Sequence, residues 1–214
     1  METETKREKI GRTGALVSVL VMIAFEVLPI LLSGWGVSSL IYYTELSNLF
    51  ALAAALTALV LFALAARKRI PAFPAWAEAL RFSAACCLTM TLLTVLFVLI
   101  PTLDVPPLSL FERHLLFLHL LAPLAAIAGL LFPFAKLPKR AMLWGMAPTW
   151  LYGAVSTVLN IAGVLRGPYP FLLVYEQPVW MSVFWFAVLI GGNALIVFGL
   201  LLIARAAEKR SGLL

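Results

Sequence analysis

Apolar stretches of membrane-spanning length alternate with short polar segments along the 214 residues of the chain. A helix needs roughly 20 predominantly apolar residues to cross the hydrocarbon core of a bilayer. The pattern therefore predicts an all-α polytopic membrane protein, a single domain built as a six-transmembrane-helix bundle. We expect residues 1–12 to form a polar, basic tail. We place the spans at approximately residues 15–32, 40–66, 80–100, 115–134, 141–164 and 179–204.

Composition agrees with this class of protein, since 63% of the residues are hydrophobic and only 12% are charged. A soluble domain carries about 25% charged residues. A net charge of +6 is common in proteins that bind nucleic acid, but the Lys and Arg residues here gather at the ends of the apolar stretches. They fall in alternate gaps, and only Arg113 and Arg166 lie on the opposite side. The positive-inside rule then predicts cytoplasmic N and C termini, and no nucleic-acid partner is needed.

One polar cluster interrupts the apolar pattern at the start of the second stretch. Thr44, Ser47 and Asn48 are spaced i, i+3 and i+4, so they share one face of a helix. Lipid offers no partner for a hydroxyl or an amide, so this face is expected to point at protein. His119 lies about as many residues from the start of the fourth stretch as Thr44 lies from the start of the second. Both side chains are therefore expected at similar depth, roughly 6–10 Å below the outer end.

A hydroxyl beside a histidine suggests nucleophilic catalysis, because a hydroxyl attacks well only when a positioned base takes its proton. Thr44 is the candidate nucleophile and His119 the candidate base. Both residues also have a structural, non-catalytic interpretation. A threonine at a helix start is usually an N-cap, and a membrane histidine is often a hydrogen-bond partner within the fold. The motifs of common hydrolases, metalloproteases and phosphate-binding loops are absent. Two histidines and two adjacent cysteines do not suggest a metal site.

Supporting roles are open to several other polar residues. Asn48 lies one turn beyond Thr44 and is a candidate donor to a developing oxyanion, and Ser47 shares its face. The group that orients the histidine ring is not determined by the sequence. A buried carboxylate such as Glu26 also has a structural interpretation, as a hydrogen-bond partner of a neighbouring helix. The candidates for orienting His119 are Glu26, Glu45 and Asn160.

Four ordered segments resemble the androgen-induced gene product family and its bacterial relatives, a family that includes the androgen-dependent regulator of tissue factor pathway inhibitor. Residues 42–49 (YYTELSNL) resemble its aromatic-Thr-x-x-Ser-Asn segment. Residues 118–124 (LHLLAPL) resemble its Leu-His-x-x-x-Pro-Leu segment, and two later segments follow in the family's order at residues 148–152 (PTWLY) and 166–172 (RGPYPFL). Bacterial relatives tend to have an aspartate soon after the last segment, whereas Glu176 is the nearest acid here.

This resemblance implies intramembrane hydrolysis of fatty-acid esters of hydroxy fatty acids, with a threonine nucleophile and a histidine that correspond to Thr44 and His119. No cofactor is implied. The expected partner is a lipid substrate that enters sideways from the bilayer, and the expected location is the bacterial inner membrane. Two other functions stay open: a non-catalytic lipid-binding or assembly protein, and a small transporter with a polar path through Glu26, Asn160 and Asn193. The sequence leaves open the acyl chain length, the oligomeric state and any role of residues 169–171.

Overall fold

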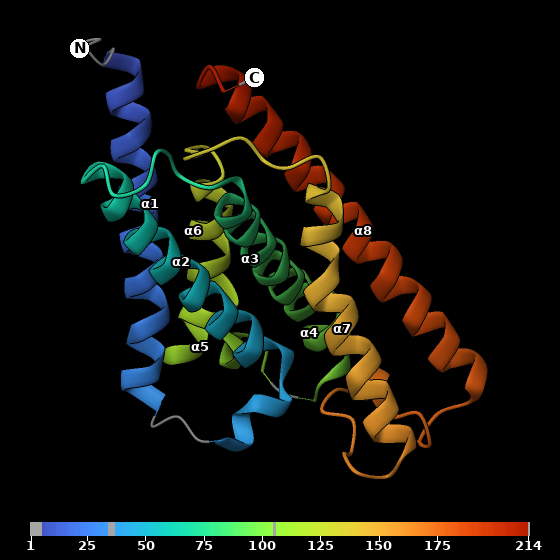
Figure 1. The fold of residues 1–214 in the computed structure, drawn as a ribbon. Coiled ribbons are helices and arrows are strands. Elements are labelled where there is room, and N and C mark those ends of the chain that lie inside the picture. The colour runs from blue at the N-terminus through green and yellow to red at the C-terminus, as the bar shows by residue number, and fades with distance from the viewer. Residues whose placement is uncertain (1–5, 34–36, 105, 214) are drawn as a thin grey trace.

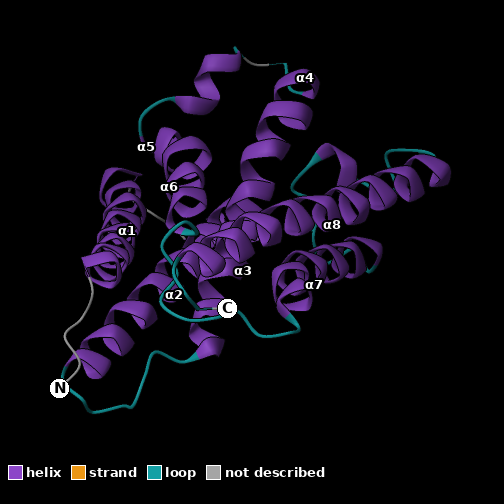
Figure 2. Ribbon diagram, turned by 90° about the horizontal axis from the view of Figure 1, so that it is seen from above, coloured by secondary structure: helices purple, strands orange, loops and turns teal. Residues whose placement is uncertain are grey.

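The computed structural model describes residues 6–33, 37–104 and 106–213, and within these ranges every regular element is a helix (Figures 1 and 2). The predicted all-α fold is therefore confirmed. The helices are α1 (Lys6–Ser33), α2 (Tyr43–Ala66), α3 (Ala75–Thr94), α4 (Ile100–Thr102), α5 (His114–Leu116), α6 (Ala122–Gly129), α7 (Ala141–Ile161) and α8 (Val179–Arg210). Three short 3-10 helices lie at Val37–Ile41, Pro107–Phe111 and Pro170–Leu172. Two π-helical turns, Val95–Leu99 and Phe117–Leu121, join α3 to α4 and α5 to α6.

Four helices among the described residues are long and apolar enough to cross a membrane. The other two predicted spans fall short for different reasons. The helical stretch His114–Gly129 is apolar but short. Helix α7 is long enough, but Thr149, Tyr152 and Asn160 reduce its hydrophobicity. The four candidate spans are Lys9–Ser33, Tyr43–Ala66, Ala75–Thr102 and Val179–Arg210.

Several boundaries differ from the expected ones. Helix α1 begins at Lys6, so the part of the predicted basic tail from residue 6 to residue 12 is helical, and residues 1–5 lie outside the described residues. The fourth segment ends at Gly129 rather than residue 134, because a turn begins at Leu130 and Pro133 follows. Helix α8 continues to Arg210, since the basic residues after the apolar stretch suit the last turn of a helix.

Successive long helices run in opposite directions, so the start of α1 and the end of α8 lie at the same end of the bundle (Figure 1). The connections formed by residues 67–74 and 130–140 lie at that end too. We call it the basic end. Helix α3 occupies the centre, with α2, α6, α7 and α8 packed around it.

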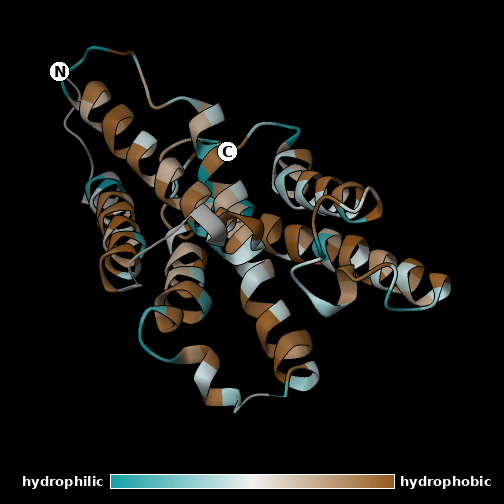
Figure 3. Cartoon of the chain, turned by 90° about the horizontal axis from the view of Figure 1, so that it is seen from below, coloured by the Kyte–Doolittle hydropathy of each residue, from teal (hydrophilic) through white to brown (hydrophobic). Residues whose placement is uncertain are grey.

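Burial follows this arrangement. In the most apolar window of α3, 67% of the residues are buried, against 17% for α8. Apolar residues make up most of the long helices (Figure 3). The outer helices expose large apolar side chains along their length, including Leu195 and Val183 of α8. Such surfaces are costly in water and are compatible with an integral membrane protein whose outer helices contact lipid.

Buried ion pairs fasten the basic end. Arg81 bonds to Glu78 on its own helix, to Ser18 of α1 and to the carbonyl oxygen of Gly129. Arg205 and Glu208 of α8 likewise pair and contact the backbone of the connection between α6 and α7. These contacts hold the helices together at the basic end, and the candidate site lies toward the opposite end (Figure 1).

Candidate functional site

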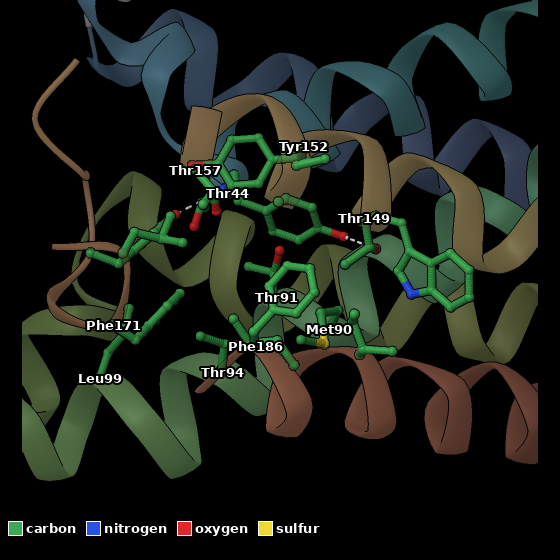
Figure 4. Close-up of a pocket in the computed structure, with 18 of the residues that line it drawn as sticks. Thr44, Met90, Thr91, Thr94, Leu99, Thr149, Tyr152, Thr157, Phe171 and Phe186 are labelled. Carbon is green, nitrogen blue, oxygen red and sulfur yellow. Dashed lines mark hydrogen bonds between the residues drawn. The ribbon is translucent and has the colours of Figure 1, made fainter. Parts of the chain in front are cut away.

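An apolar cavity of about 250 Å³, which we call the chamber, lies among α2, α3, α7 and α8 (Figure 4). Its wall is mostly apolar, although several of the lining residues carry a hydroxyl group. The residues of the wall that carry a hydroxyl group are Tyr43, Thr44, Thr91, Thr94, Thr149, Tyr152, Thr157 and Tyr169. A groove of about 500 Å³ along α7 and α8 adjoins the chamber. The lining residues common to both are Thr157, Phe171, Leu172, Phe186 and Leu189. The two cavities together form an apolar space that opens between α7 and α8.

Thr44 is the second residue of α2, and its side chain is part of the chamber wall. Thr44, Ser47 and Asn48 are all buried, which confirms the prediction that their shared face points at protein. The Ser47 hydroxyl donates to the carbonyl oxygen of Thr44 at 2.9 Å and lies 2.9 Å from the Thr91 hydroxyl of α3. Ser47 therefore fastens α2 to α3 instead of contributing directly to the chamber.

Asn48 links α2 to the segment that carries the histidine. Its side-chain nitrogen donates to the carbonyl oxygen of Thr44 at 2.7 Å and to that of Leu118 at 3.4 Å. An amide has two N–H donors, and both are used here. In this structure Asn48 therefore positions the backbones beside Thr44 and His119, and its donation to an oxyanion stays a prediction.

His119 lies in the π-helical turn Phe117–Leu121 and is buried. Its Nδ1 atom is 2.6 Å from the carbonyl oxygen of Leu110, in the 3-10 helix Pro107–Phe111. A carbonyl oxygen can only accept, so Nδ1 carries the proton and Nε2 of the neutral ring keeps its lone pair. The orienting group that sequence left open is thus a backbone carbonyl, a contact with no side-chain signature.

The two candidate catalytic residues belong to neighbouring elements. Helix α2 contacts the π-helical turn Phe117–Leu121, and Asn48 bonds the residue next to His119. Among the described residues, the chamber wall includes Thr44 but not His119. The structure therefore brings the two segments into contact, while of the two residues only the threonine borders the chamber.

The other candidate orienting residues lie elsewhere. The Asn160 amide donates to the carbonyl oxygen of Leu165 at 3.0 Å and accepts from the Val174 amide at 3.1 Å, so it fastens the loop after α7. Glu26 and Glu45 line a separate small cavity between α1 and α2. Since Leu110 occupies Nδ1 of His119, these three residues do not take the orienting role that the sequence suggested for them.

Tyr169 is a site residue whose role the sequence left open. It comes from the loop before α8, and its phenol oxygen accepts the Thr44 amide N–H at 3.3 Å. Its ring stacks on Phe171, with 5.2 Å between the ring centroids. Burial raises the pKa of the Tyr169 phenol above its usual value, so the phenol keeps its proton at neutral pH. Its O–H is therefore a donor at the chamber wall next to Thr44.

Within the described residues, no group of three or more His, Cys, Asp and Glu side chains is arranged to hold a metal ion. Comparison with protein-family models, curated proteins and solved structures finds no match to this chain. The functional assignment therefore depends on the geometry of the site and on the four segments quoted above.

Proposed function

We propose that the protein is an intramembrane hydrolase of lipid esters, of the type that joins a fatty acid to a hydroxy fatty acid. Thr44 is the nucleophile and His119 the general base. The observation that carries the proposal is the Thr44 side chain on the wall of an apolar chamber of about 250 Å³. A space of this size and polarity suits an acyl chain, and Thr44, whose amide N–H bonds to Tyr169, carries a hydroxyl that can be acylated.

We also propose six membrane spans with both termini in the cytoplasm, in a bacterial inner membrane. The shared position of the α1 start and the α8 end supports this topology, as does the basic character of that end (Figure 1). Helix α7 and the stretch His114–Gly129 run alongside the four longer helices and would complete the bundle. The chamber then lies in the outer half of the bilayer.

The proposed reaction begins when the Thr44 hydroxyl attacks the ester carbonyl and His119 Nε2 takes its proton. The phenol O–H of Tyr169 donates to the oxyanion of the tetrahedral intermediate. Collapse breaks the ester C–O bond, and His119 returns its proton to the departing alkoxide, which leaves an acyl-threonine. Water then attacks the acyl group, again with His119 as base, and releases the fatty acid and the free Thr44 hydroxyl.

Substrate entry follows from the groove along α7 and α8. A lipid ester is poorly soluble in water but dissolves in the bilayer, so it can slide sideways between these helices. Exposed apolar residues such as Phe186 and Val183 border the groove and offer no polar barrier to an acyl chain. The chemistry needs no cofactor.

The test is hydrolysis of a lipid ester by purified protein in detergent or nanodiscs. Thr44→Ala and His119→Ala are expected to reduce turnover by at least a thousandfold, while their melting temperatures stay near that of the parent protein. Thr157→Ala is the matched control, because Thr157 is another threonine of the chamber wall and has no role in the proposed reaction. Near-normal turnover by either catalytic variant would contradict the proposal.

A non-catalytic lipid-binding protein is the second candidate. The absence of His119 from the described chamber wall favours it, since a binding chamber needs no base. A fluorophosphonate probe, which reacts with activated hydroxyls, distinguishes the hydrolase from the lipid-binding protein. A lipid-binding protein would bind fatty acids in the chamber and leave the probe unreacted.

A further inference from the structure

A second, much smaller cavity lies beside the site, between the end of α1 and the start of α2. Its volume is about 10 Å³, which is room for a single water molecule or ion. Four oxygen-bearing side chains line it together with apolar residues. They are Glu26 and Ser33 of α1 and Glu45 and Asn48 of α2.

Two of these side chains are deeply buried, and each has an oxygen atom that lacks a hydrogen-bond partner among the described residues. Glu26 is 2% exposed and Asn48 is 4% exposed. The atoms concerned are Glu26 Oε1 and Asn48 Oδ1. Buried oxygen acceptors are nearly always paired, and here two of them border one cavity from two helices. The orientation of the Asn48 amide is well defined, because its nitrogen donates to two carbonyl oxygens and its oxygen must take the remaining direction.

The chemistry of the cavity selects its occupant. Every polar side chain around it offers oxygen, two of the four are carboxylates, and none is a nitrogen or sulfur ligand. Hard cations prefer such ligands, whereas zinc and the other transition metals favour imidazole and thiolate. A buried carboxylate in an apolar helix is also costly unless a positive charge or a proton meets it. We propose that this cavity binds one dehydrated hard cation of sodium or calcium size.

Such a cation would join α1 to α2 and would act on the candidate active site through Asn48. With its oxygen held by the cation, the amide keeps its nitrogen on the carbonyl oxygens of Thr44 and Leu118. The bound ion would therefore stabilise the fold and fix the relative position of the Thr44 and His119 segments. The cation site does not depend on catalysis, because a lipid-binding protein would hold the ion equally well.

The experiment measures the melting temperature of the detergent-purified chain at constant ionic strength in sodium, calcium, potassium and choline salts. Sodium or calcium is expected to raise the melting temperature over choline. Well above the Kd, each tenfold increase in the stabilising ion should add roughly 3–5 °C. Potassium is larger than sodium or calcium and holds its ligands at a longer distance, so its attraction to the carboxylates is weaker and its shift should be smaller than theirs. The ion that stabilises identifies whether sodium or calcium is the ligand.

Variants locate the response. Glu26→Gln should abolish the ion-dependent shift in melting temperature. Glu45→Gln should weaken the apparent affinity for the ion at least tenfold. Glu176→Gln is the matched control, because Glu176 pairs with Arg166 on an exposed loop, and it should keep the full shift. If Glu26→Gln does not fold, the Glu45→Gln titration decides. Equal melting temperatures of the parent protein in all four salts would overturn the proposal and assign the two oxygens to water or a proton. A full ion response in Glu26→Gln or Glu45→Gln would also overturn it.

Discussion

The Nδ1 atom of His119 lies 2.6 Å from the carbonyl oxygen of Leu110, so the histidine ring is held by the loop that precedes its own helix. This contact makes a specific spectroscopic prediction. In a His114→Gln variant only His119 remains, and its ¹⁵N spectrum should show the neutral tautomer with the proton on Nδ1. A neutral ring with its proton on Nε2 would contradict this account, because its lone pair would then lie on Nδ1, which faces the Leu110 carbonyl oxygen, and Nε2 could not accept the Thr44 proton.

Removal of the Tyr169 phenol tests the oxyanion donor. Tyr169→Phe keeps the ring that stacks on Phe171 but loses the O–H, so kcat should fall about a hundredfold or more with little change in KM. Steady-state kinetics on a lipid ester measure both constants. Tyr175→Phe is the control, since its phenol donates to the Ile161 carbonyl on the exposed part of the same loop. Equal kinetics for the two variants would exclude Tyr169 from the reaction.

The same phenol predicts how stability changes at alkaline pH. Burial raises the pKa of Tyr169 above its usual value near 10, so the folded chain binds this proton more tightly than the unfolded chain. The contribution of this proton to the free energy of unfolding is fully present below about pH 10. It is lost as the pH rises through the higher pKa of the phenol in the folded chain. Melting temperatures between pH 9 and pH 11.5 should therefore fall more steeply for the parent protein than for Tyr169→Phe. Parallel curves would contradict the buried, protonated phenol.

The length of the chamber can be altered without a clash. Gly153 borders the chamber, and an added Cβ there meets no heavy atom within 4 Å. Gly153→Leu should fold at least as well as the parent, since leucine favours a helix by about 1 kcal/mol over glycine, and should fill part of the chamber. Turnover of long-chain esters should drop about tenfold relative to short-chain esters. Gly199→Leu on α8 has equal space outside the chamber and should leave the chain-length preference unchanged.

Two ion pairs of different burial should differ in their contribution to stability. The Arg81 and Glu78 side chains are 9% and 4% exposed, whereas Arg166 and Glu176 are 77% and 52% exposed. Arg81→Met leaves a buried carboxylate without its partner and should cost about 3–5 kcal/mol of unfolding free energy. Arg166→Met should cost at most about 1 kcal/mol. Unfolding in denaturant compares the two. Glu78 keeps the hydrogen bond from the Phe134 amide in Arg81→Met, and equal losses would show that this bond compensates for the missing cation.

Some of this site could be predicted because it follows from local periodicity. The spacing of Thr44, Ser47 and Asn48 puts them on one helical face, and lipid cannot satisfy their polar groups, so their burial was predictable. The helical class of the protein followed from the length of the apolar stretches in the same way.

Other features depend on contacts between distant segments and could not be predicted. The Leu110 carbonyl reaches His119 only because the loop folds back over the start of its helix, and a carbonyl leaves no mark in the sequence. The spacing of Asn48 suggests an oxyanion donor, whereas in the structure its two N–H groups donate to backbone carbonyl oxygens. Tyr169 lies 125 residues from Thr44, a distance at which no periodicity carries information.

The central claim is that the Thr44 hydroxyl is activated by His119, and the most direct measurement is the site at which a fluorophosphonate attaches. The purified protein is reacted with the probe, digested and analysed by mass spectrometry. The account predicts a phosphonate on Thr44 in the parent protein and in Thr157→Ala, and almost none in Thr44→Ala or His119→Ala. A phosphonate on any other residue, or labelling of Thr44 that persists in His119→Ala, would contradict it.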